Sequence, residues 1–299
     1  MSPRPKGSVA PGGGAAGAAL AESAAAVPQP ANVPCVVALV FRERARAAIR
    51  AAFPRRRARL LLVHGASELS ETLRATLADA VIIDIAGGSD EADRASGLAR
   101  EFPSLPFVGI APLRGADGPA LAAAVAHDFA DVLTEGVDDG VLRALLAPVM
   151  FSTRFAGALW NPPPALGLGA PLQQSAWRSV IARGGRPVRT SELAASLGVT
   201  REHLSRSFAS AGAPNLKRVI DLVRLLAAAE LSKNPGYDVR DVARILGFAS
   251  ASHLSSTAQR VVGTRPASLA RLRAVDLVDR FGQGRGRSRA SGDKPKAGH

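Results

Sequence analysis

Short apolar segments alternate with longer amphipathic segments in the first half of the chain. The apolar segments are rich in Val, Ile and Leu and have the length of strands, which we predict at Cys35–Phe41, Arg59–His64, Ala80–Ile85, Phe107–Ala111 and Phe129–Thr134. The amphipathic segments predict helices at about 42–53, 67–78, 90–101, 117–127 and 137–149. Because continuous apolar strands need burial on both faces, the alternation predicts an α/β domain whose five-stranded parallel sheet is covered by helices on each side.

Two helix pairs with the same internal pattern occupy the second half. The first is Ser191–Thr200 followed by Arg201–Phe208, and the second is Val239–Ser250 followed by Ala251–Thr257. In each pair a glycine, Gly198 or Gly247, suits a tight turn, and a hydroxyl residue, Thr200 or Ser250, can cap the second helix. A long helix with an apolar stripe, from Pro214 to Asn234, joins the pairs. The pattern predicts an all-α domain with two helix-turn-helix units.

The length of 299 residues favours two domains with tails. Residues 1–33 and 282–299 have too few apolar side chains for their burial to offset the conformational entropy lost on folding. Between the halves, the run Asn161–Pro164 stops a helix and favours an extended linker. The predicted organisation is a disordered tail (1–33), an α/β domain (34–150), a Pro/Gly-rich linker (151–171), an all-α domain (172–281) and a disordered basic tail (282–299).

Charge separates the two halves. The chain carries 38 Lys and Arg against 25 Asp and Glu, a net charge of +13. Residues 34–150 have a net charge of −2 and residues 151–281 a net charge of +10. This asymmetry indicates that the second half binds a polyanion while the first senses or assembles. The single cysteine, Cys35, and the lack of an apolar run that could cross a bilayer favour a cytoplasmic protein without membrane contact.

The segment Val81–Asp84 resembles the third strand of a response-regulator receiver domain, a flavodoxin-like fold in which this aspartate accepts a phosphoryl group. The rest of the receiver machinery is replaced. The positions that hold Mg²⁺ after the first strand carry Phe41 and Arg42, the Ser/Thr after the fourth strand aligns with Ala111, and the lysine after the fifth aligns with Glu135. The resemblance, over about 35–149, therefore implies the fold rather than the chemistry, and we interpret the domain as a pseudo-receiver.

Asp84 has two interpretations. Phosphoryl transfer to a carboxylate needs cations that neutralise the developing charge, and this chain lacks the residues that would supply them. Asp84 is then a structural carboxylate that caps a helix or pairs with a neighbour, and a working phosphoacceptor is the alternative. We expect the guanidinium of Arg42 to form an ion pair with Asp84 at the place of the metal.

The second half resembles the DNA-binding domain of the AraC/XylS family of transcription regulators. The resemblance covers about 172–273 and is carried by Arg224, Ala228, Leu231, the Ile245–Phe248 signature and Gly263–Pro266. It implies that the connecting helix holds two recognition helices on one side of a DNA duplex. The helices would lie about one helical turn (34–36 Å) apart, each in a segment of the major groove.

The resemblance also implies which side chains face the groove: Arg201, Glu202, Ser205 and Arg206 in the first recognition helix, and Ala251, Ser252, Ser255 and Ser256 in the second. Arg206 is the best candidate for a direct base contact, because a guanidinium can bind guanine through two hydrogen bonds. A phosphate contact is its alternative role. The second helix departs from the family, with Ser256 for a common arginine and Leu254 and Ala258 for common aromatics. It is therefore expected to position the protein more than to specify sequence, or to be structural only.

The leading hypothesis is a sequence-specific DNA-binding transcription regulator whose N-terminal domain mediates dimerisation or partner contact without phosphorylation. Double-stranded DNA is the expected partner, with a homodimer through the N-terminal domain and RNA polymerase as further candidates. One alternative is an adaptor whose helix-turn-helix units bind protein, and another is a phosphorelay output regulator phosphorylated on Asp84. We find no motif for a catalytic centre, a cofactor or a metal ion, so the protein is expected not to be an enzyme.

Overall fold

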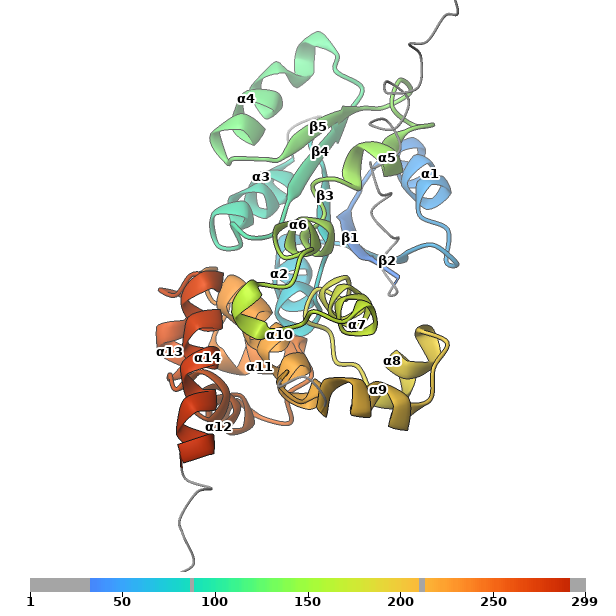
Figure 1. Cartoon of the computed structure of the whole chain (residues 1–299). Helices are drawn as coiled ribbons and strands as arrows, with labels where there is room; N and C mark the ends of the chain where they lie inside the picture. The colour runs from blue at the N-terminus through green and yellow to red at the C-terminus, as the bar shows by residue number, and fades with distance from the viewer. Residues whose placement is uncertain (1–32, 87–88, 210–212, 291–299) are drawn as a thin grey trace, which may run out of the picture.

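The computed structural model describes residues 33–86, 89–209 and 213–290, with side chains as far as Gln283. Almost all of the tail predicted at 1–33, and residues 291–299 of the tail predicted at the other end, lie outside these residues. Figure 1 shows the sheet and its helices in one half of the molecule and the remaining helices in the other.

The N-terminal domain is built on the predicted parallel sheet. Its strands are β1 (Cys35–Leu39), β2 (Arg59–Val63), β3 (Ala80–Asp84), β4 (Phe107–Ala111) and β5 (Asp131–Thr134). They are ordered β2-β1-β3-β4-β5 and every pair is parallel, which confirms the flavodoxin-like topology. The register pairs Asp84 with Ile110 and Ala111 with Thr134, so the carboxyl ends of β3, β4 and β5 meet at one edge of the sheet.

Helices cover both faces of the sheet, as Figure 1 shows. They are α1 (Glu43–Ala52), α2 (Ala66–Ala75), α3 (Asp90–Gly97) with the 3₁₀ turn η1 (Leu98–Arg100), α4 (Gly118–Ala126) after the turn η2 (Gly115–Asp117), and α5 (Leu142–Leu146). Side chains alternate between the faces. Val36, Ala38 and Ile82 pack with α1 and α5, whereas Val37, Val81 and Ile83 pack with α2 and α3.

The helix predicted at 137–149 is shorter than expected, since α5 spans only Leu142–Leu146. Side chains in the preceding loop bind backbone groups instead of leaving them to a helix. Asp138 accepts a hydrogen bond from Thr134 N at 2.7 Å, and Asp139 accepts one from Gly136 N at 2.9 Å. Such local bonds favour a turn over helical backbone.

The C-terminal domain is all-α, as predicted. Its helices are α7 (Pro171–Ile181), α8 (Thr190–Ser196), α9 (Arg201–Ala209), α10 (Leu216–Leu231), α11 (Val239–Ile245), α12 (Ala251–Val262), α13 (Pro266–Leu269) and α14 (Ala274–Ala290). The connecting helix α10 is buried on nearly all sides, which explains why apolar residues occupy most of its circumference. Figure 1 shows it running through the domain between the two helix-turn-helix units.

The segment predicted as an extended linker, 151–171, is largely folded onto the domains it joins. It begins with helix α6 (Phe151–Ala158) and contains the 3₁₀ turn η3 (Pro164–Leu166). The run Asn161–Pro164 does end the helix, but Phe151, Phe155 and Leu166 are buried. The correction has a simple cause: prolines break helices, yet apolar side chains on either side of them still gain about 1.5–3 kcal/mol each when buried.

The two domains share one continuous apolar core and are joined by polar contacts. The buried carboxylate of Asp79 accepts hydrogen bonds from Cys35 N at 2.7 Å, from Ser152 N at 3.2 Å and from Nη2 of Arg186 at 2.7 Å. These donors come from β1, from α6 and from the loop between α7 and α8. A carboxylate with three donors from three segments fixes their relative position, because leaving it unpaired in the interior is costly.

The second domain contact lies between the turn after η1 and the end of α10. Ser104 N donates to Oδ1 of Asn234 at 2.7 Å, and Ser104 Oγ donates to the carbonyl of Glu230 at 2.9 Å. Beside it, the rings of Phe102 and Tyr237 meet edge to face, 4.8 Å between centroids. The domains therefore form a packed unit rather than two bodies on a flexible tether.

The tail predicted to be disordered over 282–299 is helical as far as Ala290, because α14 continues through it. The helix is anchored where Leu277, Val278 and Phe281 are buried, and the guanidinium of Arg218 lies 5.0 Å from the centroid of the Phe281 ring. Once a helix is nucleated by such packing, each further residue costs little.

Candidate nucleic-acid interface and strand-end cluster

The first helix-turn-helix unit consists of α8 and α9. Leu193 of α8 and Leu204 and Phe208 of α9 are fully buried. The turn depends on Gly198, whose φ of +67° lies in the left-handed region that favours glycine. Thr200 Oγ1 accepts a hydrogen bond from His203 N at 3.1 Å, so the predicted cap of α9 is confirmed.

The outer face of α9 is open to solvent. Arg201, Glu202, Ser205 and Arg206 are all exposed. Within the described parts of the chain, no hydrogen bond or ion pair engages the side chains of Arg201 and Arg206. Two guanidinium groups without internal partners are therefore free for an external anion or base edge.

The second unit, α11 and α12, repeats this construction. Gly247 has a φ of +65°, and Ser250 Oγ accepts a hydrogen bond from His253 N at 3.1 Å. On the outer face of α12, Ser252 and Ser256 are exposed, and Ala251 and Ser255 are half-buried. The Ser256 hydroxyl already donates to the carbonyl of His253 at 3.1 Å. This face offers shorter and less available side chains than the face of α9.

The connecting helix α10 fixes the second unit through Arg224. Nη2 of Arg224 donates to the carbonyl of Leu246 at 3.0 Å, and its guanidinium lies 3.8 Å from the centroid of the Phe248 ring. Asp221 pairs with Arg260 of α12 at 3.0 Å. Burial lowers the pKa of Arg224, and the charge of Asp221 offsets part of that effect. These contacts tie α10 to both helices of the unit, and Figure 1 shows α9 and α12 at the end of the molecule away from the sheet.

Two cations near the second unit were not among the predicted site residues. Arg240 and Arg244 of α11 line a hollow with Ser250 and Ser252 at the start of α12. Arg244 pairs with Asp241 at 3.4 Å, whereas the side chain of Arg240 is exposed and has no partner among the described residues. Their spacing of four residues on one helix places them on a common face, a signal that was present in the sequence.

At the carboxyl edge of the sheet, Arg42 and Asp84 form the predicted ion pair. Nη2 and Nε of Arg42 lie 2.8 Å and 3.0 Å from Oδ1 of Asp84, and Nε lies 3.2 Å from Oδ2. Backbone N–H groups of Arg42 and Ala86 donate to the same carboxylate at 3.1 and 3.3 Å. Phe41 N also donates to Oδ2 at 3.3 Å, so both oxygens of the fully buried Asp84 carboxylate accept hydrogen bonds.

Glu135 completes this strand-end cluster. It is paired with Nη1 of Arg42 and lies 3.4 Å from Nε of Arg44. Partial burial lowers the pKa of Arg42, but the hydrogen bonds and charges of Asp84 and Glu135 outweigh it and raise the pKa overall. Two carboxylates are thus balanced by two guanidinium groups, with an arginine where a receiver holds a metal ligand and a glutamate where it holds a lysine.

The described residues contain no group of three or more His, Cys, Asp and Glu side chains arranged to hold a metal ion. Over the same residues, no helix is both long and apolar enough to cross a membrane.

Comparison with known proteins supports the helical domain. Residues 193–271 match a family model described as a helix-turn-helix domain, which spans both units and α10. Full-length FixJ from B. japonicum aligns with a TM-score of 0.35 and 10% identity, covering 67% of this chain and 97% of that chain. The receiver-like fold is given by the strand order β2-β1-β3-β4-β5. None of the curated proteins compared matches the chain.

Proposed function

We propose that this protein, whose residues 193–271 match a model described as a helix-turn-helix domain, is a transcription regulator of the AraC type that reads double-stranded DNA with two recognition helices. The helices α9 and α12 enter successive segments of the major groove, and α10 sets the distance between them. A basic domain with two exposed recognition helices suits the binding of DNA. The protein would then act in the compartment that contains the DNA.

The observation that carries the proposal is the exposed, unpartnered pair Arg201 and Arg206 on α9. Arg206 is assigned a base contact, which contributes about 1–3 kcal/mol of discrimination against a wrong base pair. The helix begins at the turn capped by Thr200, which fixes the backbone of its first turn, including Arg201.

The second unit is proposed to position the protein. The short side chains at Ser252, Ser255 and Ser256 reach few base edges, whereas Arg240 and Arg244 beside α12 suit phosphate oxygens. Binding should therefore be strongly salt-dependent through both units and strongly sequence-dependent through the first.

The N-terminal domain is proposed to form a homodimer and to work without phosphorylation. Exposed apolar side chains occur in the segments that precede and follow the edge strand β5 in the chain, on α4, in the loop before α5 and on α5: Leu121, Val125, Val137, Val141 and Leu145. A free strand edge beside apolar side chains is a surface that proteins normally cover. The closed strand-end cluster supports a domain that responds to assembly and not to a phosphodonor. RNA polymerase remains a predicted partner with no residues assigned.

The proposal is tested by mobility shift of the full chain with duplex DNA at several salt concentrations. Arg206→Ala should lose sequence preference, with a tenfold or larger loss on the preferred duplex, because about 1.4 kcal/mol corresponds to a factor of ten. Arg55→Ala, which removes the same charge from an exposed loop of the N-terminal domain, should have little effect. An unchanged affinity and preference in Arg206→Ala would favour the adaptor hypothesis.

A further inference from the structure

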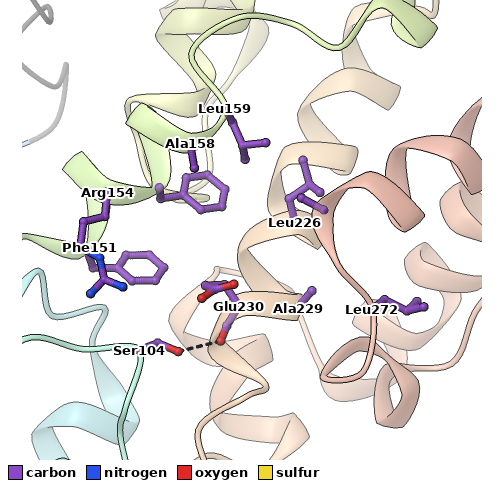
Figure 2. Close-up of a pocket in the computed structure, with 11 residues that line it drawn as sticks. Ser104, Phe151, Arg154, Ala158, Leu159, Leu226, Ala229, Glu230 and Leu272 are labelled. Carbon is purple, nitrogen blue, oxygen red and sulfur yellow. Dashed lines mark hydrogen bonds between the residues drawn. The ribbon is translucent and has the colours of Figure 1, made fainter. Parts of the chain in front are cut away.

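A cavity of about 300 Å³ lies between the two domains, beside the C-terminal half of α10. Its walls come from α6, from α10 and from the segment between α13 and α14. The apolar lining consists of Phe151, Phe155, Ala158, Leu159, Leu226, Ala229, Leu272 and Ala274. Figure 2 shows Phe151 and Leu159 on the α6 side, facing Leu226 and Glu230 on the α10 side.

The cavity has the size and lining of a small-molecule site. A volume near 300 Å³ lies at the lower end of the range for ligand pockets and corresponds to the share of roughly ten waters. Phe151 and Phe155 present two nearly parallel rings, 6.0 Å between centroids and 16° between planes. Such walls favour a flat or extended apolar body.

The charges around the cavity favour an anionic end group. Glu230 is neutralised by Lys233, with Nζ 2.5 Å from Oε2, and Asp276, two residues after the lining residue Ala274, is neutralised by Arg273 at 3.2 Å. Arg154, which lines the cavity beside Phe151, is exposed and has no partner among the described side chains. The local balance is therefore positive, and the unpaired guanidinium suits a carboxylate.

The polar contact at the floor of the cavity is already satisfied, because Ser104 Oγ donates to the carbonyl of Glu230 at 2.9 Å (Figure 2). A ligand is thus recognised by its apolar body and by one charge at the rim. We propose that this cavity binds a small apolar carboxylate, with the carboxylate on Arg154 and the body between α6 and α10. Because the ligand would touch both domains, it would stabilise their docked arrangement. Binding of this ligand does not depend on whether the protein binds DNA.

The test uses three probes with one body and different end groups: 4-phenylbutyrate, 4-phenylbutanol and 4-phenylbutylamine. In calorimetric titration of the full chain, 4-phenylbutyrate should bind saturably and about tenfold or more tighter than the alcohol and the amine. Arg154→Gln should remove that preference. Arg57→Gln, an exposed arginine in the loop before β2, should keep it.

A second variant tests the place of the body. Ala229→Leu puts three more carbons into the cavity and should weaken all three probes about tenfold or more, in protein whose thermal unfolding stays cooperative. The proposal is overturned by absence of saturable 4-phenylbutyrate binding up to about 10 mM. It is also overturned by equal binding of the three probes, by tighter binding of the amine, or by an Arg154→Gln variant that keeps the preference, whatever the outcome with DNA.

Discussion

The guanidinium of Arg42 lies against both oxygens of the Asp84 carboxylate, with Nε 3.0 Å from Oδ1 and 3.2 Å from Oδ2. The arginine comes from the loop after β1 and the aspartate from the end of β3, so the sheet topology brings together residues that are 42 positions apart. A fixed organic cation thus occupies the side of the carboxylate that a metal ion and a phosphoryl group would need. The pair supplies the counter-charge that allows the Asp84 carboxylate to stay buried.

The closed cluster predicts that Asp84 is not phosphorylated. Incubation of the full chain with acetyl phosphate and Mg²⁺ should leave its intact mass unchanged, because both carboxylate oxygens are held by donors and the lysine position carries Glu135. A phosphorylatable receiver domain in the same tube shows that the reagent is active. A mass increase of one phosphoryl group that is lost in Asp84→Asn would contradict the interpretation.

Removing the cation from the cluster should destabilise the fold. Arg42→Met leaves the fully buried Asp84 without a counter-charge, and we expect a loss of about 3–5 kcal/mol in the free energy of unfolding by urea. The matched control is Arg44→Met. The side chain of Arg44 is 72% exposed and its ion pair is with Glu135, so its loss should cost less than about 1 kcal/mol. Equal losses in the two variants would show that the Arg42–Asp84 pair has no special role.

The contact between the domains can be tested at Gly236. A Cβ added to Gly236 would lie 2.5 Å from Cζ of Phe102, a separation that forces the ring or the backbone to move. We expect Gly236→Ala to cost about 1–3 kcal/mol through overpacking. Gly140→Ala is the control, because a Cβ there meets nothing within 4 Å, and it should change stability by no more than about 0.5 kcal/mol. If Gly236→Ala were as stable as the control, the domains would not be packed as described.

Cys35 should make stability depend on alkaline pH. Burial, with a smaller contribution from Asp79, raises the pKa of this thiol from 9.0 to about 11, although Arg59 and Arg186 act in the opposite direction. The native state then holds a proton that the unfolded chain releases, so stability is complete below about pH 9 and falls as the pH rises toward 11. Two pKa units correspond to about 2–3 kcal/mol.

The measurement compares urea unfolding of wild-type protein and Cys35→Ala across this pH window. Other groups also titrate there, so only the difference between the two proteins reports on Cys35. The wild type should lose more stability than the variant between about pH 9 and pH 11. Parallel losses would mean that the thiol is not shielded in the native state.

Patterns local to the chain predicted the elements well. The β-branched runs predicted all five strands, and the paired glycines and caps predicted both helix-turn-helix units, because φ preference and capping act over a few residues. The Arg42–Asp84 pair was also foreseeable, since parallel strands place their carboxyl ends together. In each case the feature depends on residues a few positions apart, or on the order of the strands in the sheet.

Contacts between residues far apart in the chain could not be predicted from the sequence. The prolines at 162–164 indicated a spacer, but whether Phe151 and Phe155 find a buried surface depends on residues as distant as Leu226. The bond between Ser104 and Asn234 spans 130 positions and has no local signature. For the same reason the helical extension through 282–290 was missed, because it depends on Phe281 packing under Arg218. The roles assigned to individual recognition-helix residues remain predictions.

Selection of bound duplexes from random DNA tests the central claim most directly. Full-length wild-type protein and the variants Arg206→Ala and Arg55→Ala would be carried through the same rounds, and the enriched sequences compared. We expect wild-type protein and Arg55→Ala to enrich one common motif with an invariant guanine, and Arg206→Ala to lose preference at that guanine alone. Failure of wild-type protein to enrich any sequence, or an identical motif in Arg206→Ala, would contradict the account.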